Sequence, residues 1–241
     1  MTWTDIKRAA RATAAALAAC GLAGCLCGGT ACRLYGTTRT PNDIDIVIMD
    51  SILDQEDIKR RIVAADSAFF LVASTNYRNH YKILWYNLDT SGSPGSRACK
   101  VDILVPGIMC IPGIAPRQRV SFKRGENKPP MPPGMPLLPL LLLKLQAWSD
   151  HRSSLYANVV RKQYVDAVDI EELLEVCLGK LKERLKGARV LELPASFVEA
   201  GKRRIAEFCL YYPATKTKWR ALDHVFFDRR DSGHLDIHCA W

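Results

Sequence analysis

The run Pro129-Pro130-Met131-Pro132-Pro133 limits what this chain can fold into more than any other segment. Proline fixes φ and has no N–H to donate, so neither a helix nor a central strand can continue through the run, which predicts a stiff extended link. Before the link the chain mixes strand and helix patterns, and after it the pattern is helical. We therefore predict an α/β (α+β) domain over residues 1–135 and a helical domain over residues 136–241.

Hydrophobic periodicity predicts the elements of each part. In the first part we expect helices over 5–20, 30–35 and 54–65, and strands over 22–27, 43–49, 69–74, 81–86 and 100–105. In the second part we expect helices over 137–148, 155–165, 169–178, 195–211 and 216–227. With 48% hydrophobic residues, the chain has enough apolar side chains for a sizeable core.

The formal net charge of +9 and the pI near 9.1 favour an anionic partner, such as RNA or a nucleotide, although a basic balance also serves solubility alone. The apolar run 137–143 is much shorter than the roughly 20 residues that cross a bilayer. The Ala-rich start is interpreted as a helix packed on the first strand rather than as a targeting sequence. We expect a cytoplasmic protein with no membrane contact. Nine cysteines include Cys25, Cys27 and Cys32, whose spacing is not typical of zinc sites, so we interpret them as buried apolar residues.

A glycine pair closes the first predicted strand. Gly28-Gly29-Thr30 stands where a strand is expected to turn into a helix. Two glycines let the backbone approach phosphate oxygens, and the free N–H groups of the following helix attract an anion. The Thr30 hydroxyl can add a hydrogen bond. Gly-Gly turns are common, so this signal alone is weak.

Three acids lie in β-type runs near this turn. Asp43 and Asp45 are two apart in a strand and therefore point to the same face. Two like charges so close favour a cation, and carboxylate oxygens suit Mg²⁺; the alternative is a solvated strand end with two exposed acids. If the strand that contains Asp102 lies beside the Asp43 strand, Asp102 completes a three-carboxylate set that shares a metal and accepts a proton from an attacking hydroxyl.

Three segments together resemble one known superfamily: G-G-T-A at 28–31, R-T-P-N-D-I-D at 39–45 and V-D-I-L at 101–104. The pattern is similar to the DNA-polymerase-β-like nucleotidyltransferases, closest to the nucleotidyltransferase toxins of bacterial abortive-infection systems and their small relatives. The resemblance implies a mixed-sheet nucleotidyltransferase fold followed by a C-terminal helical bundle. It also implies that a nucleoside triphosphate such as ATP is bound by Gly28, Gly29 and Thr30, and that Mg²⁺ or Mn²⁺ is bound by Asp43, Asp45 and Asp102.

The second part extends the resemblance, with L-L-K-L-Q-A-W at 142–148, D-H-R at 150–152 and K-Q-Y-V-D-A-V-D-I at 162–170. By that resemblance Lys144 lies at the triphosphate and Asp166 belongs to the nucleotide site. On a helix, however, Lys162 and Asp166 are four apart and could form an ordinary surface ion pair. Arg39, four residues before Asp43, either reaches a phosphate or braces the metal carboxylates.

Together these features predict a metal-dependent nucleotidyltransferase that transfers a nucleoside monophosphate to a hydroxyl acceptor. RNA or tRNA is favoured as the acceptor, because a basic segment near the link contains Arg117, Arg119, Lys123, Arg124 and Lys128. A solvated loop is the alternative interpretation of that segment, and a protein or a small molecule is the alternative acceptor. Two other functions stay open: a nucleotide-binding regulatory protein with little turnover, and a helical module that binds a partner protein such as an antitoxin.

Overall fold

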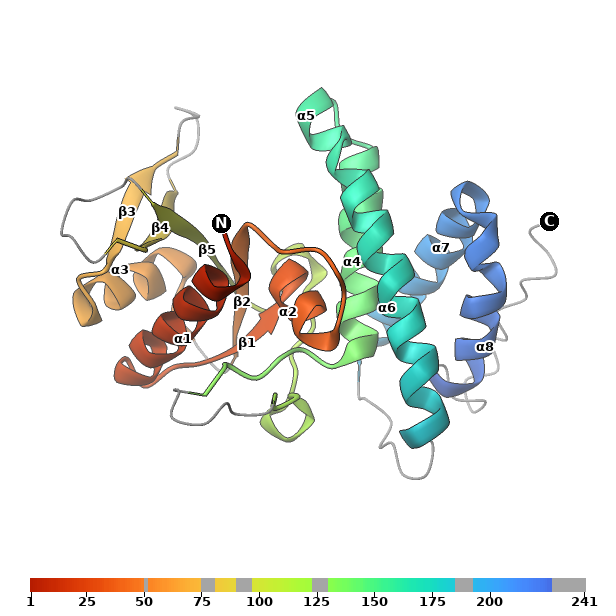
Figure 1. Ribbon diagram of the computed structural model, residues 1–241, viewed down its shortest axis with the longest axis horizontal. Helices are drawn as coiled ribbons and strands as arrows, with labels where there is room; N and C mark the ends of the chain where they lie inside the picture. The colour runs from red at the N-terminus through yellow and green to blue at the C-terminus, as the bar shows by residue number, and fades with distance from the viewer. Residues whose placement is uncertain (50–51, 75–80, 90–96, 123–129, 185–192, 227–241) are drawn as a thin grey trace. The chain divides into compact units, whose positions relative to one another are not determined.

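The computed structural model describes residues 1–49, 52–74, 81–89, 97–122, 130–184 and 193–226. The chain separates into two compact units. One comprises Met1–Leu34 and Arg39–Pro136, and the other comprises Tyr35–Thr38 and Leu137–Trp241. The first is an α/β unit and the second is helical, as Figure 1 shows.

The α/β unit is built on a five-stranded mixed sheet in the order β1-β2-β5-β4-β3. Only β2 and β5 run parallel, and the other neighbouring strands are antiparallel. The strands are β1 (Ala23–Cys27), β2 (Asp43–Met49), β3 (Phe69–Ala73), β4 (Lys82–Asn87) and β5 (Ala98–Leu104). The helices of this unit are α1 (Trp3–Ala19), α2 (Gly28–Tyr35) and α3 (Gln55–Ala65), with short 3-10 turns η1 (Ile108–Cys110) and η2 (Pro116–Gln118).

One face of the sheet is apolar and carries α1 and α3. Side chains alternate between the two faces of a strand, and the buried face of β2 and β5 presents Ile44, Ile46, Ile48, Cys99, Val101 and Ile103. Gly24 on β1 brings α1 close, since a Cβ added there would lie 2.5 Å from Ile46 Cδ1 and 3.1 Å from Leu17 Cδ1. The opposite face of β2 and β5 therefore carries their polar side chains.

A capping box begins α1 two residues earlier than the predicted start. The Thr2 hydroxyl accepts a hydrogen bond from the Asp5 N–H at 3.2 Å, and the Asp5 carboxylate accepts one from the Thr2 N–H at 2.9 Å. The hydrogen bonds from Thr2 lower the pKa of Asp5 below its ordinary value.

The proline-rich link pairs with the outer edge of β1. Leu26 N donates to Pro133 O, and Met135 N donates to Leu26 O, both at 2.8 Å. Gly134 also pairs with Val120 through two backbone hydrogen bonds of 2.8 Å. Prolines are tolerated at a sheet edge, where their missing N–H is not needed. The described part of the link is therefore an added edge of the sheet as well as a connection.

The helical unit is centred on α4 (Leu137–Arg152), which is buried on most sides. It packs against α6 (Lys162–Arg184) and α7 (Ala195–Tyr211), and α6 also packs against α8 (Lys216–Phe226). A short helix α5 (Ala157–Val160) precedes α6, and η3 (Pro213–Thr215) precedes α8. The fully buried Trp148 ring meets Phe208 edge-on at 5.0 Å between ring centroids.

The predicted division into strands and helices is confirmed, with one correction in the helical unit. Residues 155–165 and 169–178 were expected to form two similar helices, but the chain forms the four-residue α5 and then the single 23-residue α6. No glycine or proline interrupts 162–178, so nothing in the backbone ends a helix there.

Candidate functional site

The predicted site acids share the polar face of the sheet. Asp43 and Asp45 alternate with the fully buried Ile44 and are themselves half-buried. The structure places β5 directly beside β2, and Asp45 lies opposite Asp102 in the parallel register. This adjacency is the condition on which the three-carboxylate prediction depended.

Lys100 lies on the same face, although the sequence motifs did not single it out. It stands opposite Asp43 in the register and two residues before Asp102. Its Nζ contacts Asp102 Oδ2 at 2.6 Å, and both side chains are about one third exposed, 35% for Lys100 and 32% for Asp102. Burial lowers the pKa of the Lys100 ammonium, but Asp102, Asp43 and Asp45 raise it by more, so its net pKa is above the ordinary value. The polar face thus combines three carboxylates with one ammonium group.

The acids have the right side-chain type for a divalent metal site and lie on one face of the sheet, but their oxygens do not converge on one point. Carboxylate oxygens are suitable ligands for Mg²⁺ and Mn²⁺. Among the described residues, however, no three His, Cys, Asp or Glu side chains are gathered closely enough to hold one ion together. Asp102, the third predicted ligand, points its Oδ2 at Lys100 instead.

Gly28 holds the turn directly against Asp45. Its φ of +55° lies in the left-handed region that favours glycine. A Cβ at this position would lie 1.8 Å from Asp45 Oδ2, so any side chain would displace the carboxylate. Because α2 begins at Gly28, its first N–H groups, which have no acceptor within the helix, lie in the same region as the Asp45 carboxylate.

The neighbours of Gly28 have different roles. The Arg39 guanidinium lies over Gly29, since a Cβ there would be 2.7 Å from Arg39 Nη2. Thr30 is fully buried, and its hydroxyl donates to the Asp43 carbonyl oxygen at 2.9 Å. That bond fixes the start of α2 to the start of β2. The predicted phosphate contact of Thr30 therefore competes with an existing hydrogen bond to the main chain.

In the helical unit, Lys144 belongs to a buried charge cluster. Its Nζ lies 2.8 Å from Asp169 Oδ2 and 3.2 Å from Asp166 Oδ1, and its side chain is only 10% exposed. His151 Nδ1 lies 2.5 Å from Asp166 Oδ2. Asp166 and Asp169 are 4% and 1% exposed, so Asp166 is not half of a surface pair with the exposed Lys162. The cluster joins α4 to α6. His151 and Asp169 lie in the quoted sequence motifs, but the sequence analysis assigned them no role.

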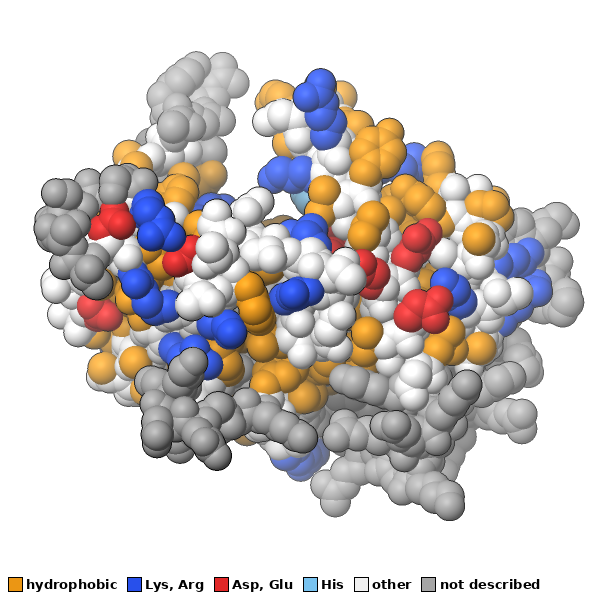
Figure 2. Space-filling model, in the orientation of Figure 1, with side chains coloured by type: hydrophobic (Ala, Val, Ile, Leu, Met, Phe, Trp, Pro, Cys, Tyr) orange, Lys and Arg blue, Asp and Glu red, His pale blue; other side chains and the backbone are white. Residues whose placement is uncertain are grey.

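The predicted basic segment is described only in part. Arg117 is exposed, and Arg119 Nε donates to the Ile114 carbonyl oxygen at 3.2 Å; Lys123, Arg124 and Lys128 lie outside the described residues. Figure 2 shows Lys and Arg side chains scattered over the face that carries α1 and α2 rather than in one dense cluster. The positive charge in view does not by itself mark an acceptor site.

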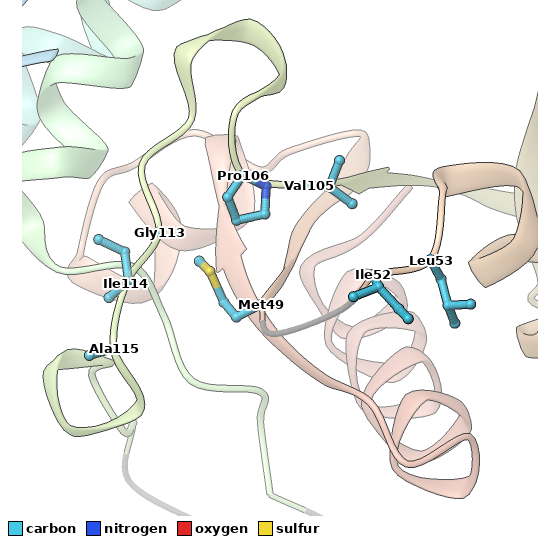
Figure 3. Close-up of a pocket in the computed structure, with 8 residues that line it drawn as sticks. All are labelled: Met49, Ile52, Leu53, Val105, Pro106, Gly113, Ile114 and Ala115. Atoms are coloured by element: carbon cyan, nitrogen blue, oxygen red, sulfur yellow. The ribbon is translucent and has the colours of Figure 1, made fainter. Parts of the chain in front are cut away.

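An open apolar pocket of about 530 Å³ lies at the other end of β2 and β5 (Figure 3). Met49 at the end of β2 and Val105 and Pro106 after β5 line it, together with Ile114. Asp43 lies at the opposite end of the seven-residue β2, which is about 20 Å long at the usual rise per residue. The pocket contains none of the predicted site residues.

The predicted burial of three cysteines is confirmed. Cys25, Cys27 and Cys32 are buried, and burial raises the pKa of the Cys25 thiol to about 12. A protonated thiol is a poor metal ligand. In the described part of the chain, no helix is both long enough and apolar enough to span a membrane.

Comparison with known proteins identifies the fold. No family model and no curated protein matches the chain. The structure is similar to that of an antigenic nucleotidyltransferase-like protein from Paracoccidioides brasiliensis, with a TM-score of 0.62, 15% sequence identity, and coverage of 90% of this chain and 93% of that chain. The predicted nucleotidyltransferase-like fold with a helical C-terminal part is thereby confirmed.

A weaker similarity is to terminal uridylyl transferase 4 from Trypanosoma brucei with bound GTP. Its TM-score is 0.31 and its sequence identity is 17%, over 86% of this chain and 65% of that chain. The same enzyme with bound CTP gives 0.31 and 16%, over 86% and 67%. A similarity of this size does not bear on the function of this chain.

Proposed function

We propose that this chain is a nucleotidyltransferase that moves a nucleoside monophosphate from a nucleoside triphosphate to a hydroxyl acceptor. The observation that supports it best is the polar sheet face, where Asp45 lies opposite Asp102 and against the Gly28 turn. The fold is that of a nucleotidyltransferase-like protein, which agrees with the proposal without establishing the activity.

In this proposal the Gly28-Gly29 turn binds the triphosphate. The N–H groups at the start of α2 face an anion with their positive ends, and the absence of side chains lets the phosphates approach the backbone. Arg39, whose guanidinium lies over Gly29, would contact a phosphate or hold the acids in place. Thr30 acts on the site through the Asp43 main chain.

The acids would hold Mg²⁺ or Mn²⁺, which when bound offsets the charge of the triphosphate and of the departing pyrophosphate. Asp102 would accept the proton of the acceptor hydroxyl as its oxygen bonds to the α-phosphorus and the bond to pyrophosphate breaks. Lys144 has two carboxylate partners at its Nζ, so we propose that it supports the helical unit rather than contacting the triphosphate. Asp166, paired with it, would have the same supporting role.

The acceptor is proposed to be RNA, with tRNA as one case. The basic charge of the chain favours a polyanion, and the exposed Arg117 begins the basic segment. A toxin role like that of the abortive-infection enzymes rests on the sequence motifs alone.

The test is to incubate the pure protein with each α-labelled nucleoside triphosphate, Mg²⁺ or Mn²⁺, and total RNA. The variant Asp43→Asn/Asp45→Asn removes two acids of the polar face, while Asp57→Asn removes an exposed acid on α3 as a matched control. We expect label in RNA with the wild type and with Asp57→Asn, and a loss of about a thousandfold or more in the double variant, in line with removal of key charge-stabilising groups. Equal transfer by all three proteins would rule out a role for these acids.

A second function is favoured by one observation: Lys100 already engages Asp102, and the described acids do not gather around a common point. The chain could then bind a nucleotide without turning it over. Tight binding of a triphosphate with no label transferred to RNA, to the protein itself or to small hydroxylated molecules would support this alternative.

A further inference from the structure

Lys100 lies among the predicted site acids on the polar face of the sheet. Four charged side chains alternate with buried ones on two adjacent parallel strands, so Asp43, Asp45, Lys100 and Asp102 form a two-by-two array on one sheet face. Lys100 faces Asp43 across the strands and binds Asp102 along its own strand at 2.6 Å. The ammonium group is therefore one of the four charged members of the array and is hydrogen-bonded to one of its carboxylates.

The array limits what can bind there. The three carboxylates share one face of two adjacent strands and repel each other, and the Lys100 ammonium offsets part of that repulsion. A divalent ion shared by Asp102 and the β2 acids would compete with the Lys100 ammonium for the negative charge of the Asp102 carboxylate, whose Oδ2 lies 2.6 Å from Lys100 Nζ. It would also lie within a few ångströms of the ammonium group, where like charges repel strongly.

We propose that Lys100 is an internal cation that neutralises part of the acidic array when no metal is present and competes with Mg²⁺ or Mn²⁺ for the Asp102 carboxylate. This inference rests on the proposed function, because it assumes that the acids bind metal. Lys100 is thus a positioning residue that sets metal affinity. Its long flexible stem, one third exposed, leaves the ammonium room to move toward solvent.

The consequence is that two cations, the Lys100 ammonium and a divalent metal ion, compete for the Asp102 carboxylate. Removing the ammonium should weaken the metal-free protein, since the acids then repel each other without that offset. Removing the ammonium should also strengthen metal binding, because the metal ion no longer has to compete with it for Asp102. A lysine that only stabilised the strand would show the first effect without the second.

The experiment measures Mn²⁺ affinity by isothermal titration calorimetry and by the loss of the free Mn²⁺ electron paramagnetic resonance signal, with no nucleotide present. Lys100→Met removes the charge and keeps an unbranched apolar stem, and Lys100→Gln repeats the test should the first variant fold poorly. Lys100→Arg keeps the charge. Lys82→Met, at an exposed position on β4, makes the same substitution away from the acids.

We expect Lys100→Met and Lys100→Gln to bind Mn²⁺ about tenfold more tightly than the wild type, with Lys100→Arg and Lys82→Met close to the wild type. The metal-free melting temperature of Lys100→Met should fall by several degrees and recover with Mn²⁺. The inference would be supported most strongly if Lys100→Met bound Mn²⁺ and the wild type did not bind it measurably.

Two results would overturn it in distinguishable ways. Should the wild type bind Mn²⁺ and Lys100→Met bind it no more tightly, or no more tightly than Lys82→Met, the inference about Lys100 fails and the proposed transferase stands. Should no variant bind Mn²⁺, the metal-dependent function fails together with it.

Discussion

Replacing Lys144 by methionine should destabilise the helical unit severely. The ammonium group lies between Asp166 and Asp169, both of which are buried. Methionine keeps most of the stem and its packing but leaves two buried carboxylates without that positive charge. Removing one partner of a buried ion pair typically costs about 3–5 kcal/mol, because the remaining charge stays desolvated.

The expected loss is therefore about 3 kcal/mol or more in the free energy of unfolding. With a urea dependence of about 1.5–2 kcal/mol per molar, the unfolding midpoint should fall by roughly 1.5–2 M. Urea unfolding followed by tryptophan fluorescence gives the midpoint, and hydrogen exchange of the α4 and α6 amides shows whether the loss lies in this unit. Adding Asp169→Asn to Lys144→Met should restore part of the stability, since it removes one buried negative charge.

The matched control is Lys218→Met. Lys218 pairs with Glu175 in the same unit at 2.5 Å, but the two side chains are 32% and 61% exposed. Water screens such pairs, so the control should lose less than about 1 kcal/mol. A Lys144→Met variant as stable as the control would contradict the supporting role that we propose for Lys144.

Three other substitutions or modifications test the α/β unit. Gly28→Ala should lower the free energy of unfolding by about 1–2 kcal/mol, because alanine is disfavoured in the left-handed backbone conformation of this residue. It should also weaken triphosphate binding at least about tenfold, because the new Cβ displaces the Asp45 carboxylate. Unchanged affinity in a binding titration would refute the proposed role of the turn in triphosphate binding. Thr30→Val should lower stability by about 1 kcal/mol through its lost hydrogen bond, whereas Thr30→Ser should not, as thermal melts would reveal. At pH 8 the native protein should react with a thiol reagent at the exposed Cys110 and not at Cys25, because Cys25 is buried and its pKa of about 12 keeps the thiol protonated. Mass spectrometry of labelled peptides measures the order of reaction, and labelling of Cys25 as early as Cys110 would contradict this prediction.

The strands of the site were readable from the sequence because their side chains alternate so regularly. The prediction for 43–49 coincides with β2, and the two-residue spacing correctly placed Asp43 and Asp45 on one face. The same spacing puts Lys100 and Asp102 together, so Lys100 could have been found by applying the rule to both runs. That β5 lies parallel to β2 was not readable, because two other strands and a helix separate them along the chain.

Helix ends and buried charges were harder to predict. The start of α1 depends on the Thr2 and Asp5 pair, a local signal that the apolar periodicity does not contain. The burial of Lys144 depends on α6 packing against α4, and a lysine in a leucine-rich helix looks the same in sequence whether it faces water or a carboxylate. The function of a charged side chain cannot be separated from its burial, which only the packed structure supplies.

The strip formed by residues 133–135 protects the outer edge of β1. An uncovered strand edge presents unpaired N–H and C=O groups that can recruit another chain, and here those of Leu26 are already taken by Pro133 and Met135. A fragment ending at residue 122 would contain every strand of the sheet and still expose this edge. It should therefore self-associate, whereas a fragment extended to Pro136 carries its own edge protection.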